Sequence, residues 1–130
     1  VLAQAGVNVR ALIIDDASPD STSEIALSLS RDDSRVSFIR HSVNMGHIAT
    51  YNHGIEWASA DYYMILSADD YLLPGALSRS VELMDSHPAV GLTFGQAITL
   101  IEGNASSPHP VGDSGTGWKI LSGPEFIRMS

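Results

Sequence analysis

The sequence contains no cysteine and few cationic residues. Without thiols the chain can form neither a disulfide nor a thiolate metal site, and this composition suits a reducing compartment. Seven lysines and arginines stand against 15 aspartates and glutamates, which gives a formal net charge of -8. This charge opposes binding to a nucleic-acid backbone or to an anionic lipid surface. An anionic ligand would therefore need a metal ion as mediator.

Long apolar runs are also missing. None approaches the roughly 20 residues that span a bilayer, and the N-terminus lacks the regions of a signal peptide. We expect a cytoplasmic location, with at most peripheral contact at the inner face of the membrane. The 130 residues suit a single domain. They begin at Val1 and stop inside a predicted helix at Ser130, so we expect a segment of a longer protein.

Two apolar runs that end in adjacent acids are the most informative features present. The runs are residues 11–14 and 62–66, and each is typical of a buried strand. The acids that follow them are Asp15, Asp16, Asp69 and Asp70. The carboxyl ends of parallel strands form the ligand edge of an open α/β sheet, and paired carboxylates suit a divalent cation that bridges to phosphate oxygens. We therefore predict both acidic pairs at one edge of one sheet.

Strand and helix patterns alternate along the chain. Strands are expected at residues 11–14, 35–40, 62–66 and 90–101, and helices at 22–30, 47–59, 74–87 and from 122 onward, with a Gly, Ser and Pro-rich loop at 103–117. Ser21 and Glu24 have the spacing of a capping box at the start of the first of these helices. This order predicts an α/β fold of three layers, with a mainly parallel sheet covered by helices on both faces.

Simpler structural explanations exist for the same residues. Asp69 and Asp70 could cap the turn before the helix at Pro74, and an Asx-turn could account for Asp16 or Ser18 without a ligand. Two Asn-x-Gly motifs follow, at 44–46 and 52–54. In the first, glycine suits a loop with a positive φ angle, and in the second it lets a helix approach a neighbour closely. The histidines at 41, 47 and 53 are scattered, and we assign none to a metal.

Four motifs in order resemble the nucleotide-binding half of the family 2 inverting glycosyltransferases, which have the Rossmann-like GT-A fold. Residues 14–20 resemble the family's Val-Asp-Asp-Gly-Ser-x-Asp segment, and the two Asn-x-Gly motifs resemble its linker. Residues 66–70 with 74–77 resemble its metal-binding stretch. The resemblance runs from Val1 to about Gly95 and is weak beyond that point.

The resemblance implies a donor site for a nucleotide-diphosphate sugar, most simply a UDP-sugar. Asp16 would contact the base, and Asp69 and Asp70 would hold Mn²⁺ or Mg²⁺. The nucleotide-binding residues would be Asp15, Asp16, Ser18, Asn44, Gly46, Asn52, Ser67 and Asp69. Transfer with inversion to a hydroxyl of a carbohydrate or lipid-linked acceptor would serve polysaccharide biosynthesis. Residues 1–102 would bind the donor, and residues 103–130 would begin the acceptor side.

The chain departs from the family pattern at several points. Ser67 replaces the first acid of the family's Asp-x-Asp, and Tyr51 replaces an arginine. The family's first strand would lie before Val1, and its catalytic base would lie beyond or near Ser130, since Glu102 and Asp113 are poor substitutes. We therefore expect this segment alone to be inactive, and the open sheet edge could pair with a second copy as a homodimer.

Two other classes remain as alternatives. A receiver-like signalling module also has an acidic pair, a further aspartate and a late lysine such as Lys119, although the spacing opposes it. A non-catalytic sugar-binding or assembly domain could keep the fold and lose the chemistry, which Ser67 would permit.

Overall fold

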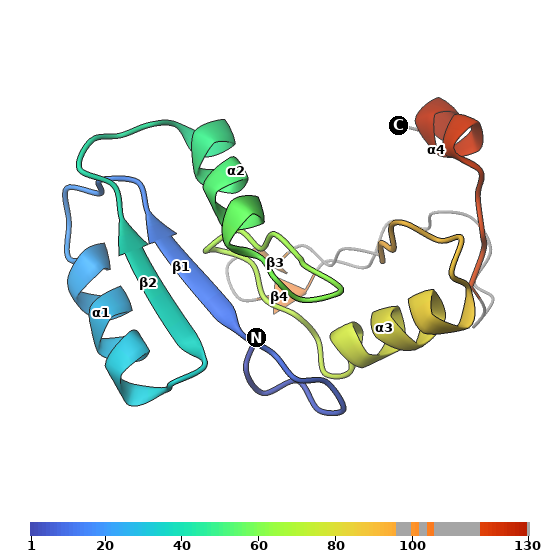
Figure 1. The fold of residues 1–130 in the computed structure, drawn as a ribbon, viewed down its shortest axis with the longest axis horizontal. Coiled ribbons are helices and arrows are strands. Elements are labelled where there is room, and N and C mark those ends of the chain that lie inside the picture. The colour runs from blue at the N-terminus through green and yellow to red at the C-terminus, as the bar shows by residue number, and fades with distance from the viewer. Residues whose placement is uncertain (96–99, 102–103, 106–117, 130) are drawn as a thin grey trace. The chain divides into compact units, whose positions relative to one another are not determined.

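The computed structural model describes residues 1–95, 100–101, 104–105 and 118–129 (Figure 1). The chain forms two compact units that divide between Val81 and Glu82. The sequence predicts a single domain whose role changes after residue 102, and that division stays a prediction.

The first unit is built on a parallel two-stranded sheet. Strands β1 (Ala11–Asp15) and β2 (Val36–Arg40) pair in the register Ala11 with Val36 through Asp15 with Arg40. Helix α1 (Thr22–Asp32) connects them as a crossover. Strand, crossover and parallel strand make the β-α-β unit of α/β folds. The predicted α/β class with a parallel sheet is confirmed.

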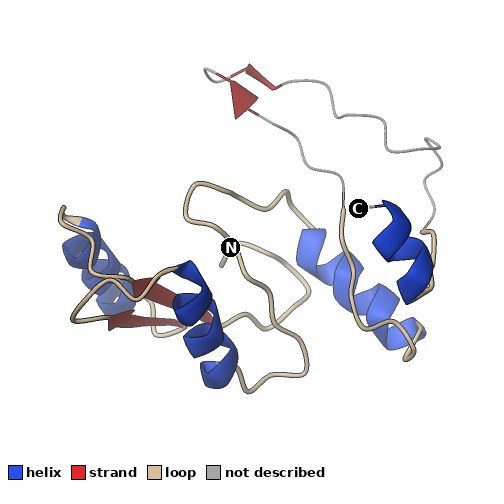
Figure 2. Ribbon diagram, turned by 90° about the horizontal axis from the view of Figure 1, so that it is seen from above, coloured by secondary structure: helices blue, strands red, loops and turns tan. Residues whose placement is uncertain are grey.

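Helices cover both faces of this sheet, as predicted. Successive side chains of a strand point to opposite faces, and Asp15 reaches Ser23 of α1 whereas Ile14 faces Gly54 of α2 (His47–Trp57). Figure 2 shows α1 and α2 on the two sides of the strands. The sheet edge after β1 therefore lies between two helices.

The start of α1 differs from the predicted capping box. Ser21 is the N-cap residue, yet its side chain makes no capping hydrogen bond. Asp20 provides the acceptor instead, because its Oδ1 receives the backbone N–H of Thr22 at 3.0 Å and the Thr22 hydroxyl at 2.6 Å. An aspartate one residue upstream competes successfully for the free N–H groups of the first turn.

Both glycines of the Asn-x-Gly motifs have the predicted structural roles. Gly46 has a φ of 82° at the start of α2. At Gly54 an added Cβ would lie 3.6 Å from Ile14 Cδ1, so α2 approaches β1 closely there. That distance is an ordinary van der Waals contact, and α2 would accommodate alanine at this position.

The predicted strand at 62–66 is absent from the structure. These residues adopt no strand conformation, and the side chains of Tyr63 and Ile65 are 61% and 47% exposed. A strand needs a hydrogen-bonded neighbour, and in the described part of the chain β1 and β2 pair only with each other. The sequence pattern reports the apolar content of this segment but not whether a partner strand is available to it.

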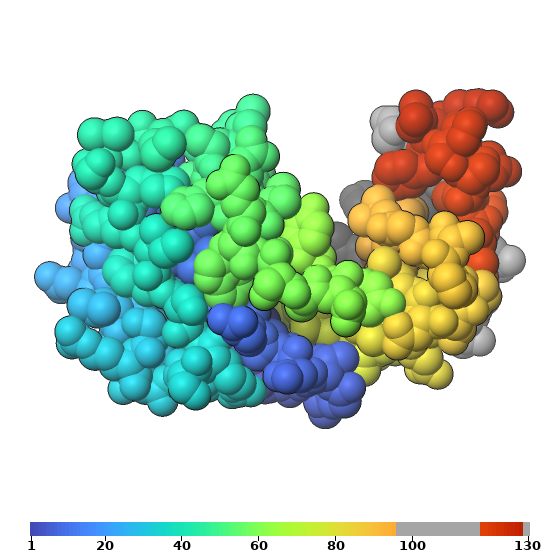
Figure 3. All heavy atoms as spheres, in the orientation of Figure 1, coloured from blue at the N-terminus to red at the C-terminus, as the bar shows by residue number. Residues whose placement is uncertain are grey.

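Other contacts hold the N-terminal residues in this unit. The Gln4 side chain donates to the carbonyl of Leu73 at 2.9 Å and accepts the backbone N–H of Leu77 at 3.3 Å. The predicted helical end at residues 1–4 is a single turn closed by one hydrogen bond from Gln4 N–H to the Val1 carbonyl. The atoms of residues 1–10, dark blue in Figure 3, lie at the surface.

The second unit contains short elements. Helix α3 (Ala76–Ser86) crosses the boundary between the units, β3 (Leu100–Ile101) and β4 (Asn104–Ala105) form an antiparallel pair, and α4 (Gly123–Met129) follows. The predicted strand at 90–101 is thus confined to its last two residues within the described part, and β4 occupies the start of the predicted loop at 103–117. The rest of that loop, with Asp113, lies outside the described residues, as does Glu102.

Candidate functional site

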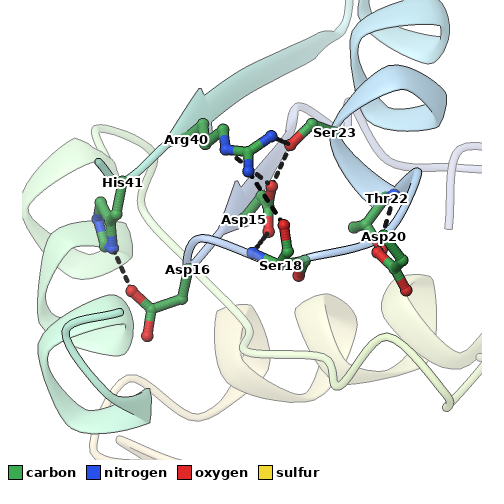
Figure 4. A network of polar contacts seen from close by, with 8 residues as sticks. All are labelled: Asp15, Asp16, Ser18, Asp20, Thr22, Ser23, Arg40 and His41. Atoms are coloured by element: carbon green, nitrogen blue, oxygen red, sulfur yellow. Dashed lines mark hydrogen bonds and ion pairs between the residues drawn. The ribbon is translucent and has the colours of Figure 1, made fainter. Parts of the chain in front are cut away.

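Asp15 is the last residue of β1, and its side chain contacts the following turn, α1 and β2 (Figure 4). Its side chain is fully buried, and one oxygen accepts the Ser18 backbone N–H at 2.9 Å. The other accepts the Ser23 hydroxyl at the start of α1 and lies 3.6 Å from Nε of Arg40 on β2. Arg40 also donates to Ser23 and to the Ser18 carbonyl. A buried charge is tolerated only with such partners.

These contacts lower the pKa of Asp15 from 3.8 to about 2. The hydrogen bonds from the side chains of Ser18 and Ser23 contribute most, followed by the Ser18 backbone N–H. Asp15 is therefore ionised at neutral pH and acts as a structural junction. The nucleotide-binding roles predicted for Asp15 and Ser18 remain predictions, and in this geometry both residues belong to the turn.

Asp16 points to the opposite side, toward α2. Its Oδ1 accepts the Met45 backbone N–H at 2.8 Å and lies 2.7 Å from His41 Nδ1, and its Oδ2 accepts the Gly46 N–H at 2.7 Å. The Met45 N–H and then His41 lower the pKa of this carboxyl. A carboxylate has about four acceptor positions. Three are occupied, which leaves one acceptor position on Oδ2 of a side chain that is 19% exposed.

The loop after β2 is shaped around Asp16. The Gly46 N–H is shared with Oδ1 of Asn44 at 3.1 Å, and the positive φ of Gly46 allows this N–H to face the carboxylate. The structure thus brings together Asp16, Asn44 and Gly46, three of the predicted nucleotide-binding residues. Asn44 fixes the loop through its side-chain oxygen.

A hollow of about 480 Å³ lies beside this loop. Its lining residues come from the end of β2, the loop and α2: His41, Met45, Ala49, Asn52, His53 and Glu56. It includes Asn52, the fourth predicted residue in this region. His41 is 8% exposed and forms part of the site, whereas sequence reasoning left it unassigned. The parallel register could have identified it, because Asp15 pairs with Arg40 and the next residues are Asp16 and His41.

Asp69 and Asp70 do not form a cluster of potential metal ligands with these residues in the described part of the chain. Both are exposed, as is Ser67, and a single turn hydrogen bond joins Asp70 N–H to the Ser67 carbonyl. Within the described residues no group of three or more His, Asp or Glu side chains is placed to hold a metal. The predicted joint edge of two acidic pairs is therefore not formed, because residues 62–66 do not join the sheet.

The donor set at Asp69 and Asp70 nevertheless fits one mode of metal binding. Mg²⁺ typically takes one or two carboxylates and completes its coordination with water and substrate phosphates. Two adjacent, exposed carboxylates supply the protein share of such a site. They would not form a closed protein cage.

The turn between β1 and α1 contains a strained residue. Ala17 has a φ of 62°, in the left-handed region that disfavours a Cβ. We expect Ala17→Gly to raise the free energy of unfolding by about 1 kcal/mol, measured by urea denaturation. Ala58→Gly is the matched control, because Ala58 has a φ of -64°. The control should be destabilised, and a loss of stability in both variants would contradict the strain.

The fold and the site together define a class of protein. A β-α-β unit with carboxylates and an ordered loop at the carboxyl end of its strands is the arrangement of nucleotide-binding α/β domains. The family model for glycosyl transferase family 2 matches residues 1–121. The chain therefore belongs to glycosyl transferase family 2, and the receiver-like alternative is set aside.

Several curated proteins are similar in sequence. An uncharacterized glycosyltransferase of Haemophilus influenzae is 31% identical over 79% of this chain and 41% of its own length. The GalNAc(5)-diNAcBac-PP-undecaprenol beta-1,3-glucosyltransferase of Campylobacter jejuni is 30% identical over 76% of this chain and 32% of its own length. The succinoglycan biosynthesis protein ExoO of Rhizobium meliloti is 34% identical over 65% of this chain and 24% of its own length. The chain thus spans less than half of each of these relatives.

No solved structure matches this chain. Among the helices in the described ranges, none has the length and apolar character needed to cross a membrane.

Proposed function

We propose that this chain is the donor-binding part of a glycosyltransferase that takes a UDP-sugar. The observation that carries the proposal is the ordered Asp16 carboxylate in a family 2 domain, with one acceptor position left on Oδ2. A uracil offers one ring N–H, which a carboxylate oxygen can accept. Asp16 is partly exposed and contacts His41 and Met45, which line the hollow, and this position supports access by such a ligand.

The proposal includes a divalent cation at the second acidic pair. Asp69 and Asp70 would hold Mn²⁺ or Mg²⁺, and the bound cation would supply Lewis-acid stabilisation of the leaving diphosphate. Asn44, Gly46 and Asn52 would keep the loop and the start of α2 in shape around the nucleoside. Transfer would invert the anomeric carbon and use a hydroxyl acceptor, for which no catalytic base is assigned within this chain.

The acceptor is proposed by analogy with a relative. The Campylobacter jejuni protein is named as a glucosyltransferase acting on an undecaprenol-linked saccharide. A carbohydrate or lipid-linked acceptor is therefore the class we propose for the protein that contains this chain. The succinoglycan protein supports a role in polysaccharide biosynthesis.

Calorimetric titration of UDP tests the donor site directly. The intact protein is titrated with UDP in the presence of Mn²⁺ and again after addition of EDTA. We expect binding with Mn²⁺ and a large loss of affinity with EDTA, because the cation bridges protein and diphosphate. CDP and ADP, which keep the diphosphate, serve as controls for the base. The absence of UDP binding in both conditions would overturn the proposal.

Asp16→Ala separates the base contact from the metal. We expect it to weaken UDP binding at least about tenfold, since it removes the acceptor and frees the loop, while Mn²⁺ affinity changes little. Asp20→Ala is the matched control, because the Asp20 side chain hydrogen-bonds to Thr22 at the start of α1 and has no contact with the Asp16 loop in the described hydrogen bonds. Equal losses of UDP and Mn²⁺ binding would instead indicate a collapsed turn.

A further inference from the structure

Two histidines extend the hydrogen-bonding of Asp16 into α2. His41 Nδ1 lies 2.7 Å from Asp16 Oδ1, and His41 Nε2 lies 2.9 Å from His53 Nδ1. The two imidazole rings are nearly parallel, with an interplanar angle of 7° and centroids 5.3 Å apart. A continuous chain therefore runs from the end of β1 through the end of β2 to α2.

The protonation states along this chain are determined by its first member. When ionised, the Asp16 carboxylate can only accept hydrogen bonds. Nδ1 of His41 therefore carries a hydrogen and donates a hydrogen bond to Asp16. Nε2 of a neutral His41 then has a lone pair and can only accept a hydrogen bond. Nδ1 of His53 must therefore be the donor to His41. Each ring is required to be the Nδ1–H tautomer.

We infer that His53 is a positioning residue for nucleotide binding, which acts by holding the His41 ring in the orientation that donates to Asp16. The inference rests on the proposed function of Asp16. If His53 did not donate to Nε2 of His41, the His41 ring would be fixed at Nδ1 alone and could turn about its side-chain bonds away from the carboxylate. Asp16 would then lose one of its three fixed contacts, and the acceptor position on Oδ2 would no longer be held in place.

The pair also responds to acid in a defined way. One added proton keeps both hydrogen bonds, because either ring can carry it while one N–H still lies between them. A second added proton places N–H groups on both facing nitrogens and breaks the bond between the rings. The other ionisable groups at this site are Asp16 and Glu56, which lines the same hollow. Arg40 is engaged with Asp15 on the other face.

The first experiment reads the tautomers by long-range ¹H–¹⁵N NMR in the intact protein, without nucleotide. We expect the Nδ1–H tautomer in both His41 and His53 when the two rings are neutral. In His53→Ala the Nδ1 proton of His41 should exchange faster with solvent, because its hydrogen bond to Asp16 is less firmly held, and His53→Asn should restore slow exchange, because the asparagine amide can donate from a similar position. His47→Ala is the control on the same helix, since His47 contacts Tyr51 at its ring edge. An Nε2–H tautomer of His41 in the wild type, or no change in His53→Ala, would overturn the inference.

The second experiment measures UDP affinity with Mn²⁺ between about pH 8 and about pH 5, the range in which histidines titrate. We expect His53→Ala to weaken binding about fivefold at the upper end, in line with one lost hydrogen bond. His53→Asn should stay within about twofold of the wild type there and should lose affinity less steeply in acid. Identical pH profiles for His53→Asn and the wild type would overturn the inference. A wild-type protein that binds no UDP would refute the proposed function, whereas the tautomer experiment would still decide the link between the histidines.

Discussion

Asp15→Ala is expected to lower the thermal unfolding midpoint by on the order of 10 °C. The substitution removes the shared acceptor of Ser18, Ser23 and Arg40, and it leaves the part-buried Ser23 hydroxyl and the guanidinium of Arg40 without this partner. β1, α1 and β2 all lose their common junction. Thermal unfolding followed by circular dichroism measures the effect.

An exposed aspartate serves as the control for this variant. Asp32 is exposed at the end of α1 and accepts one long hydrogen bond from Ser28, at 3.5 Å. Asp32→Ala should change the midpoint by no more than about 2 °C, as expected for a surface substitution. A similar midpoint for both variants would contradict the role of Asp15 as a junction.

The same carboxyl predicts a pH dependence of stability. Because the pKa of Asp15 is about 2 in the folded chain and 3.8 ordinarily, its stabilisation is present above about pH 4 and is lost as the pH falls from 3.8 toward 2. Asp15→Asn should flatten this part of the curve in urea denaturation. Asp33 has a similar pKa of about 2, owing mainly to hydrogen bonds from the Arg35 side chain. That pair is substantially exposed, so Asp33→Asn should flatten the curve less.

Asp69→Asn is expected to abolish metal-dependent UDP binding and to leave the fold intact. The exposed carboxylate makes no side-chain contact on which the described fold depends, so its loss should not change the unfolding midpoint. Replacing one of two charged ligands by a neutral amide should weaken Mn²⁺ at least about tenfold. Calorimetry with Mn²⁺ and UDP, together with a thermal unfolding curve, measures both results.

Asp61→Asn is the matched control for the metal site. Asp61 is likewise exposed and lies shortly before the same segment, and its replacement removes one negative charge without touching the predicted ligands. Unchanged UDP binding in Asp69→Asn would show that the cation is held elsewhere. Equal losses in both variants would point to a general effect of charge.

Local patterns predicted the part of the fold that local interactions determine. The crossover from β1 to β2 follows from apolar periodicity and from the need for a helix between parallel strands. The positive φ of Gly46 follows from the chemistry of a tight loop. The choice between Ser21 and Asp20 as the acceptor at the start of α1 depends on turn geometry that spacing alone does not contain.

The remaining parts of the fold and the site depend on contacts between residues distant in the sequence, and local patterns could not predict them. Whether residues 62–66 form a strand depends on a partner strand, and an apolar run carries no information about one. The separate roles of Asp15 and Asp16 follow from strand alternation, which directs neighbouring side chains to opposite faces. The contact between His41 and His53 joins residues 12 positions apart through the packing of α2, and their spacing has no motif.

The different roles of Asp15, in the fold, and of Asp16, in the proposed nucleotide site, have a practical consequence for saturation mutagenesis. A screen that reports the amount of folded protein in cells would show intolerance at codon 15, since the junction supports the sheet and α1. A screen for nucleotide capture, normalised to that amount, would show intolerance at codon 16. Two adjacent codons would thus receive opposite rankings from two reporters, and either reporter used alone would misassign one member of the pair.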